Sequence, residues 1–255
     1  MSQAYDWESI HKDLIELLRL DTTPFVMQWF EKEYDLAAIP KIRTSEKRFS
    51  PCQMIGQVIY FNWTVAVRAA NIHANYCRAI HGMFERDETF YSGKMFEGVW
   101  YAGEEAAKAH HAALVCAPAR YEAVAMSPLA SGRLPDPDVC VFYLNTAQAF
   151  LLLCGVTHIE YAKLDFTFAG ESTCSDSWIR TFVTGKTSLG IPCFAERKFG
   201  GARNDQVVVS MKPEALPKAL EGLRMLSKNG LRYPIPPYGV SVDIMDGLPA
   251  SYAKF

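Results

Sequence analysis

The sequence predicts an α/β or α+β fold in which helices flank a mixed sheet. Two observations carry this prediction. Apolar runs of strand length alternate with amphipathic stretches of helical spacing, and the order strand, helix, strand recurs along the chain. The composition, 49% hydrophobic and 21% charged residues, is typical of a globular protein with a sizeable core. We expect one compact domain over residues 1–255, with the Pro- and Gly-rich loop 132–138 as the only internal boundary.

The first half of the chain begins with an amphipathic helix, because Ile10, Leu14 and Leu17 fall at helical spacing. Ser50-Pro51 reads as the start of a second helix, with Ser as the N-cap and Pro at the first helical position. The elements expected here are helices over 7–20, 51–60, 78–84 and 104–114 and strands over 25–30, 63–69 and 121–125.

The second half begins with a continuous apolar run, 139–144, which predicts a buried strand. Asn145 is expected to cap the helix that follows. The further elements expected are helices over 147–156, 175–183 and 213–227, strands over 164–168 and 207–211, a turn over 185–190 and an extended surface tail from Tyr233.

The two halves echo one another, which suggests pseudo-repeats over 1–131 and 132–255. In each half a helix near a glutamine, Gln53 or Gln148, is followed by an expected strand and then by a polar turn ending in a cysteine, Cys77 or Cys174. An internal duplication would therefore place equivalent cysteines in equivalent positions of the two halves.

Charge and hydropathy exclude several classes of partner. The net charge is −2, so no broad positive field selects nucleic acid or an anionic membrane, and the basic clusters 41–48 and 197–203 are short. The longest apolar run, 147–156, is far shorter than the roughly 20 residues of a membrane helix. No secretory signal pattern begins the chain. We therefore expect a cytoplasmic protein with a small-molecule substrate and neither a nucleic-acid nor a membrane partner; a homo-oligomer stays open.

The chain has seven cysteines, which in a cytoplasmic protein are expected to be thiols, metal ligands or nucleophiles rather than disulfides. Three of them lie in apolar runs and are expected to be core residues: Cys116, Cys140 and Cys154. The other four lie at the ends of expected elements, beside turn residues: Cys52, Cys77, Cys174 and Cys193. Soft thiolate ligands suit zinc or an iron–sulfur cluster, although no Cys-x-x-Cys pair is present.

Several stretches of the chain resemble the prokaryotic domain of unknown function 169 family. The matching stretches are 20–26, 49–53, 76–77, 81–82, 121–129, 137–148, 168–174 and 190–197. The resemblance covers roughly residues 10 to 227 and implies cysteines at the positions of the four named above, which favours metal or cluster binding. The turn Asn71-Ile-His73-Ala-Asn75 departs from a family pattern richer in acidic residues and glycine, which suggests a changed substrate.

Histidines near the cysteines are candidates for catalysis. His73 and His81 flank Cys77, and either could act as a general base or metal ligand, or be a hydrogen-bonded turn residue. His110 and His111 are adjacent on an expected helix, so their side chains should point apart and serve the surface or packing.

Carboxylates and cations supply further candidates. Asp165 and Glu171 could form an acid–base pair, but a strand-start residue and a solvated residue are the preferred interpretations. Asp176 could orient a ligand or substrate, or be a first-turn helix carboxylate. Arg197 and Lys198, beside two glycines, could bind a substrate carboxylate or phosphate. No phosphate-binding, dinucleotide-binding or serine-hydrolase motif is present.

These observations lead to three functional hypotheses. The first is a metal- or iron–sulfur-dependent enzyme that performs lyase or redox chemistry on a small anionic or aromatic molecule, with zinc as the alternative metal. With four cysteine ligands the cluster would be closed, whereas three would leave an iron open to act as a Lewis acid. The second is a metal-free ligand-binding or sensor protein with reduced thiols. The third is thiol catalysis by Cys52, whose place in a first helical turn would favour a thiolate.

Overall fold

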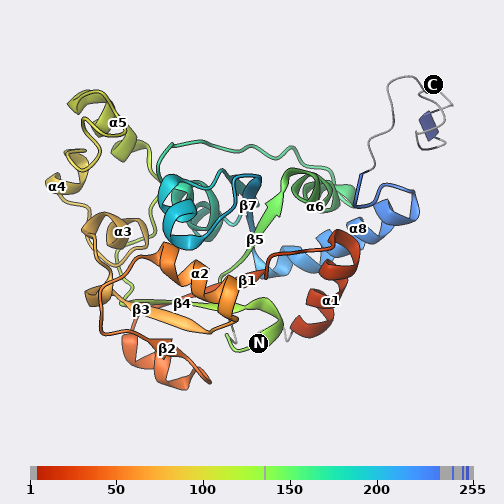
Figure 1. Ribbon diagram of the computed structural model, residues 1–255, viewed down its shortest axis with the longest axis horizontal. Coiled ribbons are helices and arrows are strands. Elements are labelled where there is room, and N and C mark those ends of the chain that lie inside the picture. The colour runs from red at the N-terminus through yellow and green to blue at the C-terminus, as the bar shows by residue number, and fades with distance from the viewer. Residues whose placement is uncertain (1–4, 135, 236–242, 244–248, 250, 253–255) are drawn as a thin grey trace.

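The computed structural model describes residues 5–134, 136–235, 243, 249 and 251–252. Its architecture confirms the predicted α/β fold with a mixed sheet flanked by helices (Figure 1). The part of the predicted tail that lies in 236–242 is outside the described residues.

Within the described part of the chain, seven strands form one sheet in the order β2-β3-β4-β1-β5-β7-β6. The strands are β1 (Phe25–Phe30), β2 (Arg43–Thr44), β3 (Val65–Arg68), β4 (Ala123–Pro128), β5 (Val139–Asn145), β6 (Ser188–Gly190) and β7 (Gln206–Met211). The short edge strand β2 runs parallel to β3, and the other neighbours pair antiparallel.

The sheet has an internal symmetry that relates the two halves of the chain. β1 and β5 pair antiparallel at the centre; β4 and then β3 lie outward from β1, while β7 and then β6 lie outward from β5. Each half therefore places its first long strand in the centre, its last strand next to it and a short strand outside. A half-turn about an axis perpendicular to the sheet relates the two arrangements. A duplication at the level of sequence stays a prediction.

Side chains of successive strand residues point to opposite faces, so the sheet separates two hydrophobic cores. One core contains Met27, Trp29 and Tyr143 and is covered by α2 (Pro51–Phe61), α3 (Asn75–Ile80) and the π-helix Ser175–Ile179. The other core is covered by α1 (Trp7–Leu18), α6 (Thr146–His158) and α8 (Leu216–Lys228), which are grouped at one end of the molecule in Figure 1.

Helix starts follow the predicted capping residues. Ser50 and Asn145 each accept a hydrogen bond from the backbone N–H three residues on, and Gln53 and Gln148 complete the two capping boxes. Further helices are α4 (Glu88–Tyr91), α5 (Glu104–Ala113), α7 (Arg180–Thr184), the π-helix Glu196–Gly200 and the 3-10 helices Glu33–Ala38, Ala69–Asn71, Leu129–Ser131 and Pro213–Ala215. In Figure 1, α3, α4 and α5 extend from the sheet at the end opposite α8.

Two expectations about local structure were wrong. The segment 164–168 is extended but pairs with no strand in the described chain; side chains bind its backbone instead, as when Arg180 donates to the carbonyl of Asp165. Phe168 in this segment is 69% exposed, so the apolar run that suggested a strand is not buried. The predicted turn 185–190 contains the edge strand β6, which pairs with β7.

α6 and α8 cross at a contact between two glycines. A Cβ added to Gly222 would lie 2.2 Å from the carbonyl oxygen of Gly155, and one added to Gly155 would lie 2.7 Å from the carbonyl oxygen of Ala219. The two backbones therefore approach more closely than any side chain at either position allows. No helix of the described residues is long and apolar enough to cross a bilayer.

Candidate functional site

The structure brings together the four cysteines that the sequence singled out. They lie on four separate helical segments that cover the same face of the sheet: Cys52 in the first turn of α2, Cys77 in α3, Cys174 directly before the π-helix Ser175–Ile179, and Cys193 shortly before the π-helix Glu196–Gly200. A negative charge on Cys52, Cys77 or Cys193 would act on the thiol of Cys174. We call this group of four the thiol site.

The internal symmetry of the sheet explains how the thiol site is assembled. In each half, one cysteine lies at the start of the helix that precedes the short strand, Cys52 before β3 and Cys174 before β6. The other lies in the segment that follows that strand, Cys77 after β3 and Cys193 after β6. This pairing corrects the predicted echo, which matched Cys77 with Cys174 through a strand at 164–168 that does not form.

Glycines allow the two halves to meet closely at the thiol site. A Cβ on Gly200 would lie 2.9 Å from the carbonyl oxygen of Cys52, and one on Gly56 would lie 3.3 Å from the carbonyl oxygen of Gly200. The first turns of α2 therefore pack directly on the backbone that follows Cys193. A larger residue at position 200 would push Cys52 away from its partners.

All four cysteines are partly buried, and this burial controls the ionisation of their thiols. It raises the pKa of Cys77 to about 11, and it raises the pKa of Cys52 and of Cys174 well above the usual range, with added contributions from Glu196 and neighbouring thiols. Burial and the nearby carboxylates of Glu196 and Glu171 also raise the pKa of Cys193. The free thiols are therefore protonated at neutral pH. Burial opposes the hypothesis that the start of α2 gives Cys52 a reactive thiolate.

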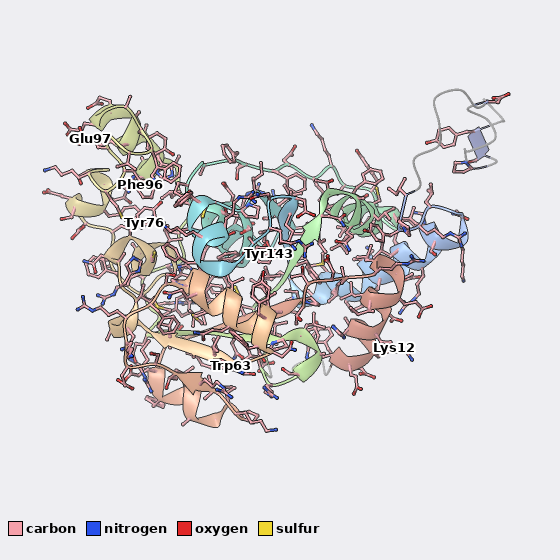
Figure 2. The ribbon with its side chains drawn as sticks, viewed as in Figure 1. Lys12, Trp63, Tyr76, Phe96, Glu97 and Tyr143 are labelled. Carbon is pink, nitrogen blue, oxygen red and sulfur yellow. The ribbon has the colours of Figure 1, made fainter. Side chains whose placement is uncertain are left out.

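Two polar residues that the sequence analysis missed lie next to the thiol site. Glu196 is 1% exposed and Tyr143 is 2% exposed. A negative charge on Cys52 or Cys193 would act on the Tyr143 hydroxyl. The Tyr143 hydroxyl and the Glu196 carboxyl interact with each other, although neither the hydroxyl nor Oε2 makes a hydrogen bond of good geometry among the described residues. Figure 2 shows Tyr143 in the middle of the molecule, near α2. Burial raises the pKa of Glu196, which favours its protonated form.

Periodicity could have identified both residues. Tyr143 alternates with Val139 and Val141 along β5, so it points to the same face of the sheet as they do. Glu196 follows Cys193 by three residues, a spacing that places two side chains on one face of a helix. The signal was obscured because Glu196 lies in a charged run that suggests an exposed turn.

The two histidines near Cys77 have different surroundings. His81 is 1% exposed; its Nδ1 lies 2.8 Å from the carbonyl oxygen of Cys77, and its Nε2 accepts a hydrogen bond from the indole of Trp178 at 3.3 Å. Both ring nitrogens are thus engaged, and burial lowers the pKa of His81 to about 4. His73 is exposed in the loop before α3.

The acidic candidates hold the backbone around the thiol site. Asp176 is buried, and its carboxylate accepts hydrogen bonds from the hydroxyl of Thr167 at 2.9 Å and the N–H of Ala169 at 2.7 Å. The carboxylate of Glu171 accepts the N–H groups of Phe194 and Ala195 at 2.8 and 3.1 Å. The expectation that Glu171 is solvated was therefore wrong, because it caps the helical segment that follows Cys193.

The basic candidates also contact their own loop. Arg197 donates to the carbonyl oxygens of Pro192 at 2.9 Å and Arg203 at 2.6 Å. Lys198 is exposed, with its amine 5.5 Å from the ring centre of Phe194 and 5.6 Å from that of Phe199. Lys198 is therefore the candidate cation more accessible to an incoming anion.

His110 and His111 do not point apart as expected. Their Nδ1 atoms are 3.4 Å apart, and both side chains are buried among aromatic rings, including Phe96. They lie near the C-terminus of α5, where the chain turns back toward the core. The interpretation as packing residues is confirmed, and the surface alternative is not.

The arrangement of possible ligands in the described chain does not match a single-ion site. No group of three or more His, Cys, Asp or Glu residues in that part of the chain has the grouping that one metal ion requires. Of the cysteines outside the thiol site, Cys140 is buried in the sheet, while Cys116 and Cys154 are partly buried.

Comparison with known proteins identifies one family. The profile of the family described as uncharacterised ArCR, the domain of unknown function 169, matches residues 13–222. An uncharacterized protein of Methanocaldococcus jannaschii, MJ0308, is 25% identical over 219 residues, which cover 83% of this chain and 91% of that protein. No solved structure matches the chain.

Proposed function

The chain belongs to the domain of unknown function 169 family, and from the geometry of its thiol site we propose that it is a cytoplasmic enzyme that holds an iron–sulfur cluster there. The observation that carries the proposal is the convergence of four thiols from four separate helical segments. Cysteines that only fill a core have no reason to gather at one place from both halves of the chain.

The chemistry of the surrounding residues supports the binding of a positively charged, soft metal ion or cluster. Thiolates are the ligands that iron–sulfur clusters and zinc prefer, and metal binding requires the thiols to lose their protons. Burial beside Glu196 opposes that loss, so only a cation at the site could offset the accumulated negative charge.

A cluster suits the site better than zinc. Zinc–sulfur bonds of about 2.3 Å in a tetrahedron require sulfur atoms about 3.8 Å apart. The described cysteines are not grouped tightly enough for a single ion, although a negative charge on Cys52, Cys77 or Cys193 would act on Cys174. A group larger than one ion would reach them with less rearrangement of the four helical segments.

The substrate would be a small anionic or aromatic molecule that undergoes lyase or redox chemistry. A bound cluster would supply electron transfer if all four thiols ligate it, or a Lewis-acidic iron if one position stays open. Lys198 would attract the anion. Glu171 and Asp176 would hold the backbone on either side of Cys174 in place. His73 is a candidate proton acceptor at the surface.

The test is the iron, zinc and acid-labile sulfide content of protein purified under strictly anaerobic conditions. Wild type, Cys174→Ser and Cys154→Ser should be compared, because Cys154 lies on α6, against the opposite core. We expect iron and sulfide in wild type and in Cys154→Ser, with loss of both in Cys174→Ser. If wild type contains zinc but no iron or sulfide, the thiol site binds zinc and the cluster proposal is replaced.

A metal-free sensor or ligand-binding protein is the second candidate, and the raised pKa values of the thiols favour it, since protonated buried thiols persist in reduced form. If anaerobic wild-type protein contains neither iron nor zinc, this candidate replaces the first.

A further inference from the structure

A cavity of about 260 Å³ lies beside the thiol site, between α3, α4 and α5. Its apolar wall consists of Tyr76, Phe84, Phe90, Met95 and His111. Aromatic rings form most of that wall, and Tyr76 and Phe90 stack with centres 5.7 Å apart and planes at 21°. The volume is slightly below the usual range for drug-sized ligands, so the cavity suits a molecule of about one ring.

Tyr76 connects the lining of this cavity with the thiol site. It directly precedes Cys77, its hydroxyl hydrogen-bonds to the side chain of Ser172, and charges on Cys77 or Cys174 would act on it. Figure 2 shows Tyr76 beside Phe96 at the end of the molecule formed by α3, α4 and α5. A molecule in the cavity would therefore contact the residue that directly precedes one of the four thiols.

The polar groups that line the cavity include hydrogen-bond donors. Oδ1 of Asn75 accepts a hydrogen bond from Arg78, which leaves the amide N–H groups of Asn75 to face a ligand. Thr89 and Lys94 add a hydroxyl and an ammonium group. Asp87 is the opposing charge in the lining, but one of its oxygens already accepts the N–H of Phe90 at 2.9 Å.

The histidine in the wall has one nitrogen left for a ligand. Nδ1 of His111 lies 2.9 Å from the carbonyl oxygen of Ala107, which assigns the proton to Nδ1 and leaves Nε2 for a bound molecule. The side chain is 2% exposed, so its remaining polar surface belongs to the cavity and its walls.

We propose that this cavity binds a small aromatic carboxylate, with its ring against Tyr76 and Phe90 and its carboxylate held by Lys94 and Asn75. Aromatic rings prefer offset-stacked or edge-to-face neighbours, which these walls provide. An ammonium group and an amide supply charge-assisted and neutral hydrogen bonds to the carboxylate. The inference goes beyond the proposed function because it rests on the walls of the cavity and not on a metal at the thiol site.

The experiment follows the methyl signal of Met95 by NMR in protein labelled with ¹³C-methyl methionine, assigned with Met95→Leu. Benzoate is titrated alongside benzamide, cyclohexanecarboxylate and benzylamine. We expect benzoate to shift the Met95 signal by ring current and to saturate with a dissociation constant of about 0.1–1 mM. The neutral and the non-aromatic probes should bind about ten-fold more weakly.

Two charge-removing variants locate the carboxylate. Lys94→Gln should weaken benzoate about ten-fold and leave benzamide unchanged, whereas Lys108→Gln, on the exposed side of α5 next to Glu104, should change neither. Lys94 is exposed and the Lys108 side chain is 42% exposed, so we expect both variants to fold.

Three results would overturn the proposal: benzoate that leaves the Met95 signal in place, equal affinities of benzoate and benzamide, or tighter binding of benzylamine, which would assign recognition to Asp87. Each titration is run on protein with and without metal. Because benzoate binding is measured with and without metal, failure of the cavity to bind benzoate is distinguishable from the absence of a cluster at the thiol site.

Discussion

Replacing Gly222 by alanine should destabilise the protein, although the same change stabilises an isolated helix. In a helix interior alanine is favoured over glycine by about 1 kcal/mol. Here the added Cβ would lie 2.2 Å from the carbonyl oxygen of Gly155, a backbone atom on α6 that no rotamer change can move. Ordinary contact begins at 3.4 Å, so α6 and α8 would have to separate by about 1 Å over the same core.

The magnitude follows from two opposing terms. Overpacking that forces backbone shifts costs up to about 3 kcal/mol, and the gain in helix propensity offsets about 1 kcal/mol of it. The expected net loss is about 2 kcal/mol in the free energy of unfolding, which lowers the melting temperature by about 4 °C in a chain of this size.

Urea denaturation at pH 7, followed by tryptophan fluorescence, measures this loss. Glu221→Ala is the matched control, since Glu221 precedes Gly222 on α8 and is exposed; its unfolding free energy should stay within about 0.5 kcal/mol of wild type. A Gly222→Ala protein that is more stable than wild type would show that the two helices do not meet at these glycines.

Three further predictions concern the surroundings of the thiol site. The pKa of His81 is about 4 in the folded chain against about 6.5 unfolded, so acidification protonates the unfolded chain first and stability falls with pH between those values. Between pH 7 and pH 5 the unfolding free energy should drop about 2 kcal/mol less in His81→Gln than in wild type or His73→Gln; equal drops would contradict the burial of His81. Glu171→Ala removes the acceptor of two backbone N–H groups and should cost about 1 kcal/mol by urea denaturation, while Glu171→Gln costs less; equal losses would show that no hydrogen bond is involved. Ser50→Ala breaks the capping box of α2 and should also cost about 1 kcal/mol, with Ser50→Asp close to wild type; a neutral alanine variant would refute the cap.

Local signals in the sequence were enough to predict much of the fold. Ser50 and Asn145 act through hydrogen bonds to residues three positions away, so their helix starts were predictable without knowledge of the rest of the chain. The same holds for β1 and β5, whose apolar runs are buried on both faces of the sheet.

The predictions of secondary structure were wrong where residues distant in the sequence determine the conformation of a segment. The run 164–168 has the composition of a strand, yet Asp176 binds the backbone N–H of Ala169 and the hydroxyl of Thr167. Because the carboxylate of Asp176 already accepts these two donors, the segment would form few additional hydrogen bonds by joining the sheet. β6 was missed for the converse reason, because only its pairing with β7 makes a three-residue segment a strand.

The four cysteines of the thiol site were predictable from the sequence, but their burial and their polar neighbours were not. Positions at element ends indicated all four cysteines, whereas their shared burial depends on how two halves of the chain meet. Glu196 and Tyr143 show the same limit, since periodicity indicates the face on which each side chain lies but not that the two residues meet at the thiol site.

The half-turn relation in the sheet has a consequence for the origin of this protein. Each half carries two of the four cysteines, so a chain of half this length could not complete the site alone. An ancestor with one such unit would have been functional only as a symmetric homodimer, with the site on its twofold axis. If the predicted duplication occurred, later divergence of the two copies would account for α4 and α5, which have no counterpart in the described part of the second half.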